Sequence, residues 1–287
     1  MSIAYNPADK FEIKVWDVEF RRAPARTLMA RIYQPQGDGP FPAVLDLHGG
    51  AWNDKDRTAN APMDENLAAS GLLVVAIDLT LAPEAPYPAS VQDANYGVRW
   101  LKAKAPEWNG DPATIGALGS SSGGHVMELC AMRPRDPRYA AHSLSEAPNA
   151  NGTVAYLATR SPVSDPFVRF GQAEKMGREE MIQNTRIYFN PWETIHEGNP
   201  QEILDRGESA TLPPLLIMQG ELDDNVLPAV QEKFAKSYRA AGGHCELEIF
   251  ADCEHMWVAT PGPQADRAAE VVKDFISRQL SALRRAA

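Results

Sequence analysis

Three consecutive serines lie between Gly119 and Gly123 in the middle of the chain. The run reads G-x-S-x-G with Ser121 at its centre, and it falls between a predicted strand over 113–118 and a predicted helix over 122–132. A sharp strand-to-helix turn of this kind presents a serine hydroxyl as a nucleophile, and small flanking residues let the turn close. The alternative is a serine-rich loop that caps a helix. The strand and the helix on either side favour a nucleophile, Ser121.

A serine hydroxyl attacks a carbonyl only when a base takes its proton, and histidine is the usual base. With this kind of turn the acid and then the histidine follow the serine along the chain. His255 follows the last predicted strand, over 245–250, and precedes a long amphipathic helix. His244 opens that strand and is expected to be structural, and His196 lies in an irregular segment. We therefore predict His255 as the base.

The acid is expected in the loop after the preceding strand, where the chain reads GELDDNV. We predict Asp223 as the carboxylate that orients His255, with Asp224 as the fallback. The simpler interpretation of the pair is a solvated turn in which one aspartate caps the next helix. Asp224 could have that role even if Asp223 is catalytic.

The negative oxygen that forms during attack needs backbone N–H donors held in place. One donor is the residue after the nucleophile, Ser122. The others are expected from Gly50 and Ala51, because HGGAW at 48–52 directly follows a predicted strand. His48 is expected to organise this loop. The alternative for the HGG run is an ordinary tight turn.

Buried strands and amphipathic helices alternate along most of the chain and position these residues. Apolar runs bounded by turn residues predict six buried strands, and the intervening patterns predict helices, which together indicate a mostly parallel sheet in an α/β fold. The strands are expected at 43–50, 71–79, 113–119, 152–159, 213–220 and 245–250, and the helices at 61–70, 90–105, 123–132, 228–241 and 264–285. The alternating segments 10–22 and 26–35 predict an antiparallel pair that precedes them.

The stretch 161–209 interrupts this alternation with a charged, mixed composition. It is expected to be helical with turns and to lie as a cap over one edge of the sheet. A length of 287 residues is close to the upper limit of one hydrophobic core. We therefore expect a single domain over 1–287, with 161–209 as an inserted lid within it.

At this point the chain resembles the α/β-hydrolase superfamily, near the hormone-sensitive-lipase-like esterases and related small carboxylesterases with an HGG loop. The resemblance rests on LHGGAW, LAPEAPYPASVQDA, GSSSGGH, QGELDDNVLP and EHMW, which occur in this order. Two motifs depart from the hormone-sensitive-lipase-like pattern. Ser120 and Ser122 replace the Asp and Ala of GDSAGG, and the acid loop is similar to that of the feruloyl-esterase-like branch, where the first Asp of the pair is the acid. The resemblance thus supports Asp223 and leaves the substrate open.

The resemblance implies a carboxylesterase that cleaves small to medium esters through an acyl-enzyme and needs no cofactor or metal. An aryl formamidase or a lactonase with the same triad is the alternative, and a non-catalytic ligand-binding module on this fold is a remote one. Aromatic residues near the site are expected to wall an apolar pocket, although ordinary packing is the simpler interpretation of each: Trp52, Phe167, Phe170, Tyr188, Trp192 and Trp257. Arg160, Arg169 and Arg186 could bind a substrate carboxylate, but an exposed position is expected for each.

Composition limits the partners and the compartment. A net charge of −10 disfavours binding to nucleic acid, whose phosphates would be repelled. No apolar run is long enough to span a membrane, and the first residues lack the apolar core of a signal peptide. The three cysteines show no metal spacing and no disulfide framework, which fits a reducing compartment. We expect a cytoplasmic enzyme with a small-molecule ester as its partner, and a homodimer is left open.

Overall fold

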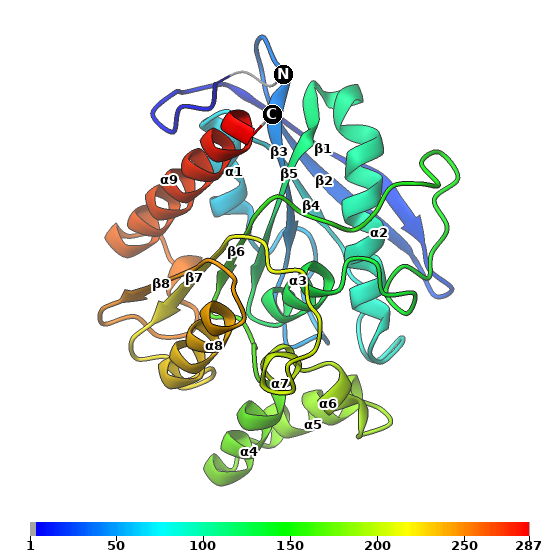
Figure 1. Ribbon diagram of the computed structural model, residues 1–287, viewed down its shortest axis with the longest axis vertical. Coiled ribbons are helices and arrows are strands. Elements are labelled where there is room, and N and C mark those ends of the chain that lie inside the picture. Colours follow the sequence, from blue (N-terminus) through cyan, green and yellow to red (C-terminus); the bar gives the residue numbers. More distant parts are fainter. Residues whose placement is uncertain (1–3, 287) are drawn as a thin grey trace.

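The computed structural model describes residues 4–286, and an eight-stranded sheet runs through its centre (Figure 1). The strands lie in the order β1-β2-β4-β3-β5-β6-β7-β8. Their bounds are β1 Ile13–Arg22, β2 Thr27–Pro35, β3 Phe41–Leu47, β4 Leu73–Ile77, β5 Gly110–Ser120, β6 Leu157–Arg160, β7 Leu215–Gly220 and β8 Cys245–Phe250. The predicted α/β fold is confirmed, since β3 to β8 pair with one another in parallel, whereas β1 pairs antiparallel with β2 and β2 antiparallel with β4.

The apolar runs of the sequence form the centre of this sheet. Every residue of β3, β4 and β7 is buried, which is typical of strands covered on both faces. The predicted strand 152–159 is wrong in its first half, because pairing with β5 begins only at Ala117 and Leu157. The ring of Tyr156 fills the space over Gly116, where a Cβ would lie 2.0 Å from it. Tyr156 is the residue that directly precedes β6.

Helices cover both faces of the sheet (Figure 1). Apolar residues of α1 (Ala61–Ala69) and α9 (Pro263–Ala286) form one core with one face. Those of α2 (Ala89–Lys104), α3 (Ser122–Met132) and α8 (Pro228–Ala240) form a second core with the other face. Short 3-10 turns follow α2 at Ala105–Trp108 and precede α9 at Trp257–Ala259. The five helices predicted from sequence are confirmed to within one residue at each end.

The segment 161–209 contains four helices, drawn in green to yellow at one end of the sheet in Figure 1. They are α4 (Pro166–Met176), α5 (Glu179–Tyr188), α6 (Thr194–Glu197) and α7 (Pro200–Asp205). Asp165 caps α4 by accepting a hydrogen bond from the N–H of Val168, and Asn199 caps α7 in the same way from Glu202. The helical character expected of this segment is thus confirmed.

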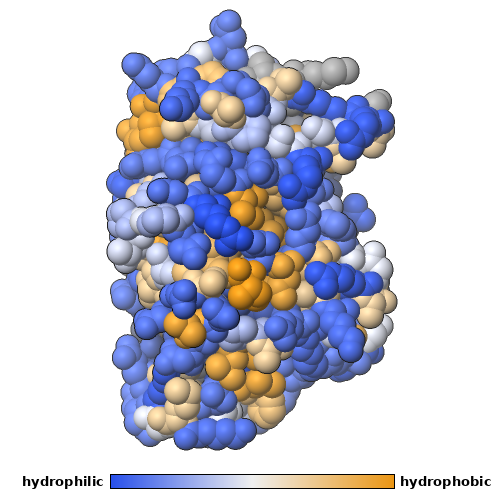
Figure 2. Space-filling model, turned by 90° about the vertical axis from the view of Figure 1, so that its left-hand side faces the viewer, coloured by the Kyte–Doolittle hydropathy of each residue, from blue (hydrophilic) through white to orange (hydrophobic). Residues whose placement is uncertain are grey.

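The surface carries few large apolar side chains. Figure 2 shows hydrophobic surface on one face as separate patches between hydrophilic side chains. Among the described helices none is both long and apolar enough to cross a lipid bilayer.

Candidate active site

Ser121 lies at the turn between β5, which ends at Ser120, and α3, which begins at Ser122. Its φ of 51° is a backbone angle that non-glycine residues rarely adopt, so the turn is strained at this residue. A Cβ at Gly119 would lie 2.7 Å from the carbonyl oxygen of Gly123, and a Cβ at Gly123 would lie 2.2 Å from that of His48. Only glycine fits at both flanking positions, which explains the spacing of the motif.

Three side chains from separate loops meet at this turn. The Nε2 atom of His255 lies 2.9 Å from Oγ of Ser121, and its Nδ1 atom lies 2.8 Å from Oδ2 of Asp223. His255 follows β8 and Asp223 follows β7, so both come from loops after parallel strands. Such loops collect at the carboxyl edge of a parallel sheet. The structure therefore brings together the serine, base and acid that the sequence predicts.

The carboxylate of Asp223 is buried and fully hydrogen-bonded. Its Oδ1 atom accepts from the backbone N–H groups of Asn225 (2.9 Å) and Val226 (2.8 Å), and Oδ2 also accepts from Gln219 (3.0 Å). Burial raises the pKa of Asp223, but the hydrogen bond and the charge of His255, with the N–H of Val226, outweigh burial and hold that pKa below its usual value. Asp223 is thus an anion at neutral pH.

Asp224, the fallback acid, is not part of this arrangement. Its side chain is 64% exposed and forms an ion pair with Arg178, which precedes α5. The structure does not support a capping role for Asp224 either, because its side chain makes no N-cap hydrogen bond to α8. The ion pair of Asp224 with Arg178 joins the acid loop to the segment 161–209.

The HGGAW loop lies directly against the serine turn. A Cβ at Gly49 would be 3.2 Å from Cβ of Ser121, and Gly50 and Ala51 have positive φ angles of 102° and 50°. His48 is buried and its Nδ1 atom lies 2.8 Å from the carbonyl oxygen of Gly49, so it holds the loop as expected. Burial also lowers the pKa of His48, which keeps its ring neutral.

The three predicted N–H donors are free within the described chain. The N–H groups of Gly50, Ala51 and Ser122 donate no hydrogen bond to any described residue. Ser122 is the first residue of α3, where an N–H has no partner inside the helix. These groups are thus available to a ligand, as an anion-stabilising site requires.

A cavity of about 290 Å³ opens onto Ser121 and His255. It combines apolar and polar residues from the HGGAW loop, α1, the serine turn, the segment 161–209 and the loops after β7 and β8. Its lining includes Gly50, Ala51, Lys55, Met63, Arg160, Arg169, Glu180, Asn184, Asn225, Met256 and Val258. No group of three or more His, Cys, Asp or Glu side chains within residues 4–286 could hold a metal ion.

Comparison with known proteins places this arrangement in a family. The model of the BD-FAE family matches residues 31–238, which is more than half of the chain. The chain belongs to the BD-FAE family. The match includes the HGGAW loop, the serine turn and Asp223, and it ends before His255.

Relatives and solved structures of this BD-FAE chain are named as esterases. The probable carboxylic ester hydrolase LipM of Mycobacterium tuberculosis is 35% identical over 200 residues, which cover 68% of this chain and 44% of that protein. Carboxylesterase NlhH of the same species is 36% identical over 97 residues, 33% of this chain and 30% of that protein. This chain therefore matches less than half the length of these two relatives.

Solved structures cover nearly the whole BD-FAE chain. EstE1, a thermostable carboxylesterase from a metagenomic library, aligns with a TM-score of 0.76 and 25% identity over 94% of this chain and 91% of that one. A Thermogutta terrifontis esterase, Est2, with bound propionate aligns with a TM-score of 0.71 and 20% identity over 94% of both chains. The fold of this chain is thus an α/β-hydrolase fold.

The six aromatic residues predicted to wall the pocket do not line the cavity of this BD-FAE chain. Trp52 is buried, stacks on Tyr188 at 4.6 Å and donates from Nε1 to Nδ1 of His125 (3.1 Å). Phe170 packs on Trp192 at 4.5 Å. The prediction is corrected for these four, because aromatic rings gain more from packing on one another than from facing a polar cavity.

The other two predicted pocket residues, Trp257 and Phe167, also pack on other rings outside the cavity. Trp257 stacks on Phe250 at 4.2 Å, and Phe167 is 42% exposed and packs on His196 at 4.7 Å. The cavity of this BD-FAE chain is instead walled by small aliphatic, methionine and polar residues.

Sequence reasoning missed a buried polar network beneath the serine turn of the BD-FAE chain. The hydroxyl of Ser120 donates to Oδ1 of Asn60 (3.2 Å), and Arg160 donates to the same oxygen (2.8 Å). Asn60 in turn donates to Asp46, whose pKa is raised by burial. The replacement of the usual acid by Ser120 was the one available signal. Asn60 lies 60 residues from Ser120 in the sequence, and Arg160 lies on the neighbouring strand β6.

Proposed function

We propose that this protein is a serine hydrolase that cleaves carboxylic esters through an acyl-enzyme. The observation that carries the proposal is the continuous hydrogen-bonded chain from Ser121 through His255 to Asp223. Its two distances, 2.9 and 2.8 Å, are within hydrogen-bond range for a nucleophile, a base and an orienting acid. The esterase names of LipM, NlhH and EstE1 support the same reaction.

Ser121, His255 and Asp223 have separate roles in the proposed reaction. Ser121 attacks the ester carbonyl while Nε2 of His255 takes the hydroxyl proton. Asp223 keeps the proton of His255 on Nδ1 before attack and stabilises the imidazolium afterwards, because its carboxylate is anionic and faces that atom. His255 then gives its proton to the departing alcohol oxygen. Water then attacks the acyl carbonyl while His255 takes one of its protons, and His255 returns that proton to Oγ of Ser121 as the acid leaves.

The N–H groups of Gly50, Ala51 and Ser122 would hold the negative oxygen of each tetrahedral intermediate. Within the described chain they donate to no other group, and Gly50 and Ala51 line the same cavity as Ser121. Loss of one such donor in a serine hydrolase costs about 3 to 4 kcal/mol of transition-state stabilisation. The contact between His48 and Gly49 and the positive φ angles of Gly50 and Ala51 define the shape of the HGGAW loop that presents two of these donors.

The cavity supports a small or medium ester substrate. Its volume of about 290 Å³ is near the lower end of ligand pockets, which favours short acyl groups. The complete triad argues against the alternative of a non-catalytic binding module. An aryl formamidase or a lactonase would use the same groups, but no residue of the cavity specifically favours either.

The segment 161–209 is proposed to act as a cap on the hydrolase domain, because Arg169, Glu180 and Asn184 from it line the cavity. We further propose that the protein works in the cytoplasm. The three cysteines, Cys130, Cys245 and Cys253, are buried and unpaired, which fits a reducing compartment.

The decisive experiment is active-site labelling with a fluorophosphonate, followed by mass spectrometry of the labelled peptide. We expect one label on Ser121 and none in Ser121→Ala. A panel of 4-nitrophenyl esters of increasing acyl length, an aryl formamide, a feruloyl ester and a lactone then separates the reactions. Turnover of the short esters with none of the formamide or lactone supports the proposal. Absence of labelling in the wild type, or equal labelling of the alanine variant, contradicts it.

A further inference from the structure

Arg169 is a buried cation in the wall of the catalytic cavity. It comes from α4, is 5% exposed, and lines the cavity together with Ser121 and His255. Its Nε and Nη2 atoms both donate to one neutral oxygen, Oδ1 of Asn225, at 2.9 and 2.8 Å. Its guanidinium carbon lies 5.7 Å from the centre of the Trp52 ring. The exposed position expected for this arginine is therefore wrong.

This guanidinium lacks an anionic partner. Among residues 4–286 no carboxylate forms an ion pair with it, and its Nη1 atom is buried without a hydrogen-bond partner. The charge of Asp223 acts on this guanidinium, but both oxygens of that carboxylate already accept hydrogen bonds from other groups. Burial lowers the pKa of Arg169 to about 10, so it still carries its charge at neutral pH. A buried, unpaired charge is costly to keep and is therefore typical of functional sites.

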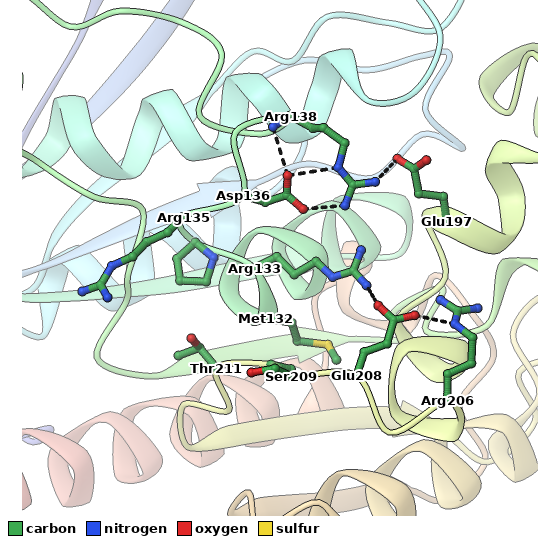
Figure 3. Close-up of a pocket in the computed structure, with 12 residues that line it drawn as sticks. Met132, Arg133, Arg135, Asp136, Arg138, Glu197, Arg206, Glu208, Ser209 and Thr211 are labelled. Carbon is green, nitrogen blue, oxygen red and sulfur yellow. Dashed lines mark hydrogen bonds and ion pairs between the residues drawn. The ribbon is translucent and has the colours of Figure 1, made fainter.

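The arginines of a second cavity show the contrast. This cavity of about 760 Å³ lies away from the triad and is drawn in Figure 3. Arg133 and Arg206 both pair with Glu208, and Arg138 pairs with Asp136 and Glu197. Arg135 points away from this network in Figure 3. The guanidinium groups that face one another there already have carboxylate partners, whereas Arg169 has none.

Other charges of the catalytic cavity do not supply the missing anion. Arg160 is bound to Asn60, and the charges of Asp46 and Asp64 act on it. Asp54, Lys55 and Glu180 are exposed to water, unlike Arg169. The amide Nδ2 of Asn225, which also lines the cavity, donates to no described residue and is a second free donor beside Arg169.

We propose that Arg169 binds a carboxylate on the substrate, so that the enzyme prefers esters that carry an anionic group over neutral esters of the same size. The preference rests on the proposed esterase function. The guanidinium of Arg169 and the free amide Nδ2 of Asn225, both from residues that line the cavity, are the groups that would hold the carboxylate, by charge-assisted hydrogen bonds. Each such bond is strong enough to change a rate about 10- to 100-fold.

Two matched pairs of esters test this preference. The first pair carries the charge on the acyl side: the 4-nitrophenyl hemiester of succinate against 4-nitrophenyl methyl succinate. The second carries it on the alcohol side: 4-acetoxybenzoate against its methyl ester. We expect kcat/KM to be about tenfold or more higher for the anionic member of at least one pair. Equal kcat/KM values within both pairs would overturn the proposal.

Three substitutions of Arg169 identify the group responsible. Arg169→Gln and Arg169→Met remove the charge with different shapes and are expected to bring the anionic-to-neutral ratio of kcat/KM to about one or below. Arg169→Lys keeps the charge and is expected to retain part of the ratio. The ratio is the readout because loss of the Asn225 contact could slow both esters equally. A ratio unchanged in both charge-removing variants would contradict the role of Arg169.

Arg186 provides the matched control. It is an arginine of the same segment whose side chain is 59% exposed, lies 3.8 Å from Glu174 and packs over Phe170 and Trp192, outside the cavity. Arg186→Gln is expected to leave both kcat/KM values unchanged. If the wild type is labelled by fluorophosphonate but shows no preference, this inference alone fails. If it is neither labelled nor active on any ester, the proposed function fails.

Discussion

The hydroxyl of Ser120 donates to the side-chain oxygen of Asn60, 3.2 Å away. The residue next to the proposed nucleophile therefore already has a partner, whereas Ser121 faces His255. Three adjacent serines thus have three different surroundings. Ser122 contributes its backbone N–H at the start of α3.

This difference predicts unequal effects of two alanine substitutions. Ser121→Ala is expected to lower kcat on a 4-nitrophenyl ester by about 10⁶-fold, because the nucleophile is lost. Ser120→Ala removes one neutral hydrogen bond, worth about 1 kcal/mol, and is expected to keep most of the activity while lowering stability slightly. Steady-state kinetics and thermal unfolding of both variants check this. An equally inactive Ser120→Ala would mean that the nucleophile has been placed one residue too late.

The two adjacent aspartates are expected to differ in the same way. Asp223→Asn should lower kcat by about 10⁴-fold, because an amide in place of the carboxylate favours the wrong tautomer of His255. Asp224→Asn loses only an exposed ion pair with Arg178, which contributes at most about 1 kcal/mol. The measurement is kcat on one short ester for both variants, with circular dichroism as the folding control. A severe defect in Asp224→Asn alone would reassign the acid.

Trp52 is expected to stabilise the fold through its hydrogen bond to His125. Burial lowers the pKa of His125 to about 4, so its neutral ring accepts at Nδ1 from Trp52 and donates from Nε2 to Gly198. Trp52→Phe leaves Nδ1 buried without a donor, at a cost of about 1 to 3 kcal/mol beyond the loss of ring contacts. We expect a lower free energy of unfolding, measured by urea titration.

Trp257→Phe is the matched control for this prediction. The Nε1 atom of Trp257 is buried without a partner among the described residues, so its removal breaks no hydrogen bond to them. Its loss of stability should therefore be smaller than that of Trp52→Phe. The reverse order of the two variants would show that the contact with His125 contributes nothing.

Glu128 in α3 gives the stability a specific dependence on pH. Burial raises the pKa of Glu128 from 4.5 to about 8, against the hydrogen bond from Ser164. Between these values the folded protein holds a proton that the unfolded chain releases. The contribution of this group to stability is therefore complete below pH 4.5 and is lost as pH rises through 8.

Glu128→Gln, which cannot ionise, removes this dependence. The free energy of unfolding of the wild type should fall relative to that of the variant as the pH is raised from 5 to 8. Urea titrations of both proteins at four pH values give this difference. Parallel curves across the range would show that Glu128 is not protonated in the folded state.

The triad was predictable from sequence, whereas the cavity wall was not. Ser121, Asp223 and His255 each follow a strand whose apolar run is plain in the sequence, and parallel strands bring their carboxyl ends to one edge. The aromatic residues gave no such signal, because nothing in the sequence tells which face of α5 or of the HGGAW loop turns inward. Trp52 and Tyr188 stack on each other although they lie far apart in the chain. The burial of Arg169 was missed for the same reason, since its partner Asn225 belongs to another loop that lies far away in the sequence.

The contacts between the segment 161–209 and the acid loop limit how this protein can be re-engineered. Arg169 binds Asn225 and Arg178 pairs with Asp224, so two arginines of the segment hold the residues that follow Asp223. A chimera that exchanges this segment for the corresponding part of a relative would leave residues 223–226 without their supports. The transferable unit is therefore the segment together with that loop, and a graft of the helices alone would alter the catalytic acid as well as the entrance.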